Sequence, residues 1–279
     1  MIYKEYLRIS RGIIWLSIVC ALFLALTGYG RLTSHSPAST IDVEIGADAG
    51  THSAQAAHHA VKHVHHAVHP GPHQPVIPWS LLFAIAGIVA TIFAGIYGAS
   101  LSNENQGHLE VAWTKPRSRS RYALIDMAAD YAGATCAFAL TLLTAVACLA
   151  IAGLVTNLFI DRDAWLNLVR FLVLPLAWLG LVQAATASLR ERSGAVSGGL
   201  WVAAVALLGL EIADLPRMWH GVVAFLNFFN PLNYSGYRTD SSGHLAASIA
   251  DLQADILALV LLGVAGILVA LVQWRKLEA

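Results

Sequence analysis

Six apolar runs, each long enough to cross a bilayer as a helix, alternate with polar segments along the 279 residues of this chain. A hydrocarbon core about 30 Å thick needs about 17–25 apolar residues in a helix. The runs cover 12–28, 79–101, 132–156, 165–187, 195–213 and 256–274. Hydrophobic residues make up 57% of the chain and charged residues only 12%, which argues against a water-soluble globular domain. The sequence therefore predicts an all-α membrane protein, a single domain over 1–279 with six transmembrane helices.

The segment before the first run has a pattern of its own. Residues 1–11 place Ile2, Tyr6 and Ile9 at helical spacing among basic side chains. This predicts a short amphipathic helix at the membrane surface, and a basic flank of the first span is the alternative interpretation. The first run also fits a signal peptide, but no small-residue cleavage site follows Leu26, so we expect an uncleaved anchor.

The distribution of basic residues predicts the orientation. Six spans put both termini on one side, and placing them in the cytoplasm puts 11 of the 17 lysines and arginines inside, as the positive-inside rule requires. These are Lys4, Arg8, Arg11, Lys115, Arg117, Arg119, Arg121, Arg190, Arg192, Arg275 and Lys276. We therefore expect cytoplasmic termini in a bacterial-type inner or plasma membrane. Segments 29–78 and 214–255 would lie outside and 102–131 inside; the apolar piece 219–229 is too short to cross and predicts a re-entrant segment.

Two features of the runs concern packing and charge. In the second run Ala90, Ala94 and Gly98 recur every fourth residue, a small-residue stripe that permits close helix packing. Arg170, Glu211 and Asp214 lie near span ends on the predicted outer side. Ionisable groups at membrane depth often mark substrate pathways, but an arginine at this position is expected to snorkel to the interface.

Eight histidines fall between His52 and His73, in the predicted outer loop. If the loop were helical, His59, His63 and His66 would share one face, a spacing that suits zinc, copper or nickel. The same composition is typical of an exposed low-complexity loop without a function in metal binding. We predict no resident metal, and a metal-binding membrane protein that uses this loop stays as the alternative.

Motifs for enzymatic chemistry are missing from the sequence. The four lysines are followed by Glu, His, Pro and Leu, whereas a P-loop needs Lys followed by Ser or Thr. Neither an H-E-x-x-H pair nor a G-x-S-x-G elbow occurs. The three cysteines lie inside apolar runs, and a net charge of zero gives no reason to expect nucleic-acid binding. We therefore expect a non-catalytic membrane subunit without cofactor or nucleic-acid partner.

The segment 102–131 combines cations with exposed apolar side chains. Four cations lie within seven residues around the helix-breaking Pro116: Lys115, Arg117, Arg119 and Arg121. Leu109, Val111 and Trp113 precede them between polar residues. Such a patch on a cytoplasmic segment indicates a docking surface for a soluble partner, and anchoring at lipid headgroup level is the alternative.

This segment resembles the cytoplasmic segment after the second span in permease subunits of type-2 ABC exporters. The positions that carry the resemblance are Glu104, Gly107, Leu109, Glu110, Pro116, Ser118 and Arg119, and His108 stands where the family often has Thr. A second similarity is Asn230-Pro231-Leu232-Asn233-Tyr234, which is similar to the family's N-P-x-x-Y element between spans five and six.

The resemblance implies a coupling helix within 102–121 that docks on a separate ATP-binding subunit. The implied contact residues are Glu104, Gly107, His108, Leu109, Glu110, Trp113, Pro116 and Arg119. It further implies a second permease subunit, identical or different, that pairs with this one around a central export path in the lipid bilayer. A membrane scaffold without a transported substrate remains the other alternative, and nothing in the sequence indicates the substrate.

Overall fold

The computed structural model describes residues 2–34, 76–99, 102, 119–189, 192–213, 216–236 and 248–276. These residues are mostly helical, and six of their helices are long and apolar enough to cross a membrane, which confirms the predicted all-α architecture for this part of the chain. The six are α1 (Ile2–Ser34), α2 (Trp79–Tyr97), α5 (Arg119–Ala152), α6 (Ala164–Thr186), α7 (Ser193–Ile212) and α9 (Ile249–Lys276). The 12-residue α8 (Arg217–Phe228) is too short to cross and covers most of the predicted short apolar piece.

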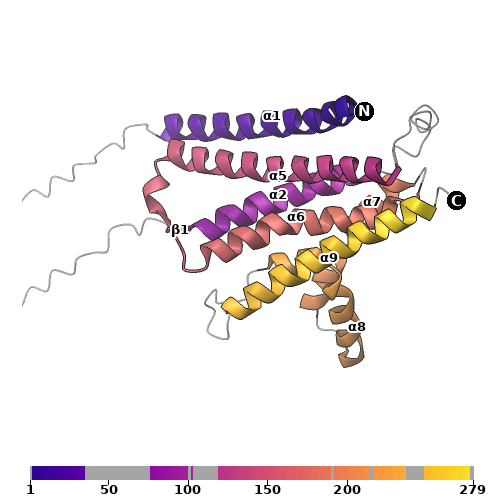
Figure 1. The fold of residues 1–279 in the computed structure, drawn as a ribbon. Helices are drawn as coiled ribbons and strands as arrows, with labels where there is room; N and C mark the ends of the chain where they lie inside the picture. Colours follow the sequence, from indigo (N-terminus) through magenta and orange to yellow (C-terminus); the bar gives the residue numbers. More distant parts are fainter. Residues whose placement is uncertain are drawn as a thin grey trace, which may run out of the picture.

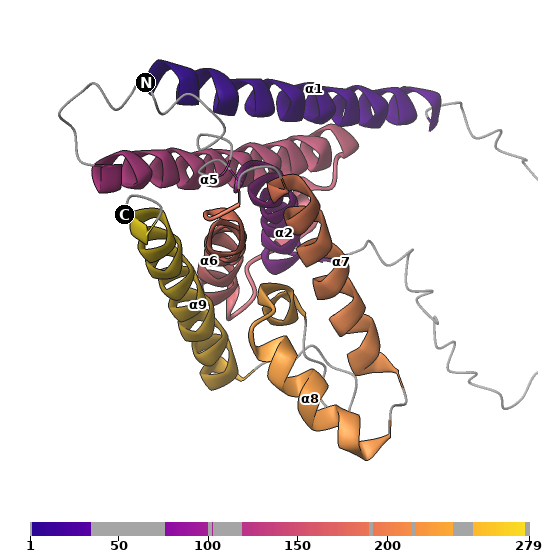
Figure 2. The same ribbon diagram turned by 90° about the vertical axis from the view of Figure 1, so that its right-hand side faces the viewer.

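Helices α2 and α6 form the centre of the bundle. Inside the protein, 61% of the α2 span and 56% of the α6 span are buried, against 11% for α1 and 17% for α7. Helix α5 lies between α1 and most of this centre, α9 runs along α6, and α8 projects below α7 (Figures 1 and 2). The predicted small-residue stripe lies in the core, because Ala90 and Ala94 are fully buried and Gly98 approaches Val182 of α6.

Backbone meets backbone where α6 crosses α9. A Cβ atom on Gly266 would lie 2.5 Å from the carbonyl carbon and oxygen of Gly180, and a Cβ on Gly180 would lie 2.8 Å from the carbonyl oxygen of Gly263. Small residues allow such an approach, which increases van der Waals contact between helices in lipid. Because no side chain separates the two backbones, α6 and α9 are the most tightly joined pair around these glycines.

The predicted amphipathic surface helix is not a separate element. Residues 2–11 continue without a break into the first span, in one helix from Ile2 to Ser34 (Figure 1). Gly12, where the apolar run was expected to begin, lies inside this helix, and a Cβ there would meet the Tyr97 ring at 2.5 Å. The glycine thus allows α1 to approach α2, and it does not end a helix at this position.

Helices α5 and α9 begin earlier than the apolar runs that predicted them. Helix α5 starts at Arg119 and not near 132, so the last 13 residues of the predicted 102–131 loop are helical. Helix α9 starts at Ile249 and not near 256. The added turns carry polar side chains, which a hydropathy pattern assigns to loops, but in the structure several of them point into the bundle.

A small parallel strand pair joins two connections at the opposite end of the bundle from the termini. Strand β1 (Ile77–Pro78) pairs with β2 (Leu158–Phe159), which follows the 3-10 turn η1 (Val155–Asn157). The backbone N–H of Ser80 also donates to the Asp161 carboxylate, with a nitrogen–oxygen distance of 3.4 Å. The start of α2 is therefore tied to the α5–α6 connection.

Candidate functional site

Most of the predicted coupling residues lie outside the described residues, so the structure shows only the parts of the chain next to them. Glu104, Gly107, His108, Leu109, Glu110, Trp113 and Pro116 lie outside the described residues, and Arg119 is the first residue of α5. The histidines between His52 and His73 also lie outside them, as does Asp214. Both flanks of the segment 103–118 are described, and they show where it is attached.

Each flank of this segment is held by a hydrogen bond to a different helix end. On the α2 side, the Ser102 hydroxyl donates to the backbone carbonyl of Leu189, just beyond α6. On the α5 side, Arg275 near the end of α9 donates from Nε to the Ser120 hydroxyl oxygen at 3.3 Å. The attachment points of 103–118 are thus fixed to the ends of α6 and α9, the pair joined by the glycine contact.

The start of α1 and the end of α9 lie at this same end of the bundle (Figure 1). Several exposed cations of the described residues mark it, and we call it the basic end: Arg11, Arg121, Arg192, Arg275 and Lys276. Beneath them a small core joins α5, α6 and α9, and its buried members are Ala123, Met127, Ala187, Ala270 and Trp274. The attachment points therefore stand on a packed layer of side chains.

Two carboxylates lie inside α5 next to this layer. Asp126 and Asp130, one turn apart, are each only 1% exposed. The Gln183 amide of α6, fully buried, donates from Nε2 to an Asp130 carboxylate oxygen at 3.3 Å. The apolar run 132–156 contains no acidic residue, but α5 begins 13 residues before this run and thereby brings both carboxylates into the bundle.

These carboxylates do not build a metal centre by themselves. Among the described residues, no group of three or more His, Cys, Asp or Glu side chains is arranged to hold a metal ion. The sequence did contain a signal that the carboxylates of α5 lie on a helix. Ala123, Met127, Asp130 and Ala134 follow a helical period that continues into the third apolar run. Hydropathy alone missed it because it counts each aspartate against a helix in the membrane.

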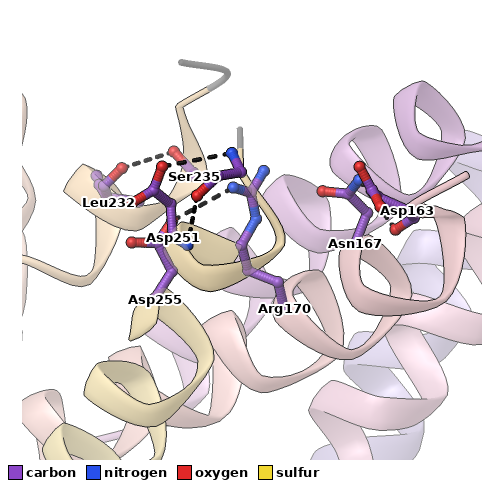
Figure 3. A network of polar contacts seen from close by, with 8 residues as sticks. Asp163, Asn167, Arg170, Leu232, Ser235, Asp251 and Asp255 are labelled. Atoms are coloured by element: carbon purple, nitrogen blue, oxygen red, sulfur yellow. Dashed lines mark hydrogen bonds and ion pairs between the residues drawn. The ribbon is translucent and has the colours of Figure 1, made fainter. Parts of the chain in front are cut away.

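Arg170 does not snorkel to the interface as predicted. It is 1% exposed, and its Nη1 lies 3.5 Å from Oδ2 of Asp255, which is 5% exposed. Figure 3 shows the arginine extending from α6 toward α9, and its guanidinium carbon also lies 4.7 Å from the Phe171 ring centre. Asp255 lies just before the predicted run 256–274, and the early start of α9 brings this carboxylate into the bundle as the partner of Arg170.

The N-P-x-x-Y element forms a hydrogen-bonded corner between α8 and α9. The Asn230 side chain accepts from Leu232 N at 3.1 Å and donates to the Ala204 carbonyl of α7 at 3.0 Å. Pro231 begins the 3-10 helix η2 (Pro231–Ser235), and the Tyr234 hydroxyl donates to the Phe228 carbonyl at 2.9 Å. The motif therefore fastens the short α8 to the neighbouring span.

Glu211 and Asn227 extend this corner along α7. The Asn227 amide donates from Nδ2 to the Glu211 carboxylate at 2.8 Å, and its carbonyl oxygen accepts from Asn230 at 3.2 Å. Asn227 is 1% exposed, whereas Glu211 is exposed. Glu211, which the sequence suggested for a substrate pathway, thus has a structural partner that explains its position.

Replacing Asn230 by alanine should lower the free energy of unfolding by about 2 kcal/mol, because it removes the cap on the Leu232 N–H and the hydrogen bond that joins the corner to the Ala204 carbonyl of α7. Unfolding in detergent micelles with increasing dodecyl sulfate measures the change. The control is Asn233→Ala in the same 3-10 helix, because within the described residues no hydrogen bond of the Asn233 side chain is found. Equal losses for the two variants would contradict the assigned function of Asn230.

Comparison with protein-family models, curated proteins and solved structures finds no match for this chain.

Proposed function

We propose that this chain is the permease subunit of a type-2 ABC exporter. In this function it forms the transmembrane path in a bacterial inner or plasma membrane and receives work from an ATP-binding subunit. A second permease subunit completes the path. The observation that carries the proposal is the attachment of segment 103–118, which is held at one flank to the end of α6 and at the other to α9.

The arrangement supports transmission of movement from this segment into the membrane. Ser102 bonds just beyond α6, and Ser120 bonds to Arg275 of α9. The two receiving helices touch through Gly180, Gly263 and Gly266, so that a displacement of one carries the other with it. A partner that pushes on the basic end would therefore tilt the α6–α9 pair against the rest of the bundle.

The charge distribution and the sequence support a cytoplasmic position of the basic end. The exposed cations of the basic end gather where the described termini lie, and positive residues remain in the cytoplasm during insertion. An ATP-binding partner is a cytoplasmic protein, so the docking segment has to face that side. The absence of a P-loop from these 279 residues agrees with ATP hydrolysis on another chain.

A four-alanine replacement of Gly107, His108, Leu109 and Glu110 tests the docking function. The tagged chain is purified from its native membranes in mild detergent, and the sample is assayed for a P-loop ATPase by mass spectrometry and for ATP hydrolysis. We expect the unchanged chain to retain such a partner. In the variant, the amount of co-purified ATPase and the rate of ATP hydrolysis should each fall at least tenfold, because the replaced residues would form the contact.

The matched control is Val155→Ala with Thr156→Ala, two exposed residues of η1 at the opposite end of the bundle. It should retain the partner and the hydrolysis in full. Both variants must reach the membrane and elute as single peaks in size-exclusion chromatography. A four-alanine variant that keeps the ATPase at the level of the unchanged chain, or an unchanged chain that never retains one, would overturn the proposal.

A further inference from the structure

Three exposed cations of the basic end lie on the neighbouring ends of α5 and α9, and we call the line where these two helices meet the α5–α9 seam. Arg121 lies in the first turn of α5, and Arg275 and Lys276 lie in the last turn of α9. The hydrogen bond from Arg275 to Ser120 joins the two helix ends. Because it uses only Nε of an exposed guanidinium, the remaining donors of Arg275 can bind an oxyanion in a bidentate manner.

The two helices of the seam are closely packed beneath these cations. Tyr122 of α5 and Trp274 of α9 stack with ring centres 6.5 Å apart and an angle of 23° between their planes. Ala123 and Ala270 on the same two helices are fully buried, which allows the helices to approach closely. The cations therefore project from backbones whose relative position is set by packing, as a preorganised site requires.

An exposed apolar column leads along α9 to the same place. Its members recur at spacings of three and four residues and are each about half exposed: Leu257, Leu261, Val264, Leu268 and Val272. Arg275 and Lys276 follow Val272 after three and four residues, so the column ends directly below them on one helix face. On α5, Leu124 and Ile125 are likewise exposed one turn after Arg121.

We propose that the α5–α9 seam at the basic end is a binding site for one anionic phospholipid. The phosphate lies between Arg121, Arg275 and Lys276, and an acyl chain follows the apolar column of α9. Basic pockets between helix ends bind anionic headgroups. A zwitterionic lipid carries its own cation beside the phosphate, so the three positive side chains favour a headgroup with net negative charge. The site shares Arg275 with the attachment of segment 103–118, but lipid binding itself does not depend on the proposed export function.

The full-length chain in a neutral detergent is titrated with phosphatidylglycerol, and bound lipid is counted by native mass spectrometry. Phosphatidylcholine with the same acyl chains and inorganic phosphate are the other two ligands. We expect one tightly bound phosphatidylglycerol, with phosphatidylcholine at least tenfold weaker and no binding of inorganic phosphate. Equal affinity for the two lipids would overturn the proposal, and phosphate binding alone would show a free-anion site in place of a lipid site.

The variant Arg121→Gln, Arg275→Gln and Lys276→Gln assigns the binding to this seam. Because each cation contributes about fivefold to the affinity for an anionic lipid, the triple variant should bind phosphatidylglycerol about a hundredfold more weakly. Lys276→Gln alone, at the exposed end of α9, should lose about fivefold and covers the case in which the triple variant does not fold. Arg192→Gln, an exposed cation of the basic end before α7, should bind as the unchanged chain does.

Two results would contradict the assignment to this seam. One is a Lys276→Gln variant with unchanged affinity for phosphatidylglycerol. The other is a triple variant that keeps its affinity for phosphatidylglycerol, whether or not it still co-purifies with the ATPase.

Discussion

Gly266→Ala is expected to lower the free energy of unfolding by about 2 kcal/mol, although it adds a single methyl group. The new Cβ would stand 2.5 Å from the carbonyl carbon and oxygen of Gly180, and these are backbone atoms that cannot turn aside as a side chain can. Helices α6 and α9 would have to separate along their tightest contact. Unfolding by dodecyl sulfate in mixed micelles, followed by tryptophan fluorescence, measures the loss.

The same substitution at Gly28 of α1 is the control, since nothing lies within 4 Å of a Cβ placed there. Alanine has a higher intrinsic helix propensity than glycine by about 1 kcal/mol, so Gly28→Ala should leave stability unchanged or raise it slightly. Opposite signs at the two positions would isolate the effect of the backbone contact. A neutral Gly266→Ala would mean that α6 and α9 are not in contact at this position.

Asp255→Leu should cost roughly 3–5 kcal/mol of the free energy of unfolding, because it leaves the Arg170 guanidinium buried without this carboxylate. The double variant Arg170→Met with Asp255→Leu should recover most of the loss, since two apolar side chains can fill the same space without buried charge. The difference between the double variant and the sum of the singles gives the coupling energy of the pair.

Asp251→Leu, one turn earlier on α9, provides the comparison for this cycle. Asp251 is only partly buried, and its carboxylate accepts a hydrogen bond from the backbone of Ser248 at the helix start. Losing this cap should cost about 1 kcal/mol, and Arg170→Met should not reduce that cost. Additive losses for Arg170 and Asp255 would show that their contact does not contribute to the stability of the folded chain.

The six spans could be predicted because a surface that faces lipid has to be apolar. The exposed side chains of α1 and α9 are long runs of Ile, Leu, Val and Phe, and such runs are visible in the sequence without any knowledge of packing. The Ala90–Ala94 stripe was likewise readable, since small residues at a spacing of four indicate a close helix contact. These features depend on local composition alone.

The partners of the buried polar groups could not be predicted, because each partner lies far away in the sequence. Asp130 is stable inside the bundle next to Gln183 of α6, and Asp255 is stable next to Arg170. A polar residue whose partner is unknown looks like the end of a span, which is why α5 and α9 were expected to start late. The glycine contacts between α6 and α9 could not be predicted for the same reason. Nothing in the sequence around Gly180 reveals that Gly266 lies opposite it.

The candidate site was only partly accessible from the sequence for a different reason. The resemblance in 104–119 concerns residues that would contact another protein, and a single chain does not contain the other half of such an interface. The structure adds the two hydrogen bonds that attach the flanks of that segment to the bundle, one from Ser102 and one to Ser120. Neither serine is distinctive in the sequence, since both are ordinary residues at the ends of polar runs.

The pairing of β1 with β2 has a consequence for the biogenesis of the protein. Helices α2 and α5 lie between the two strands in the chain, and Ser80 and Asp161 beside the pair are 81 residues apart. Since strands can pair only when both have arrived on the same side of the membrane, the segment between them has to cross an even number of times. The pair therefore forms only after α2 and α5 have inserted as a hairpin. It places both strands on the same side of the membrane, whatever the distribution of charged residues.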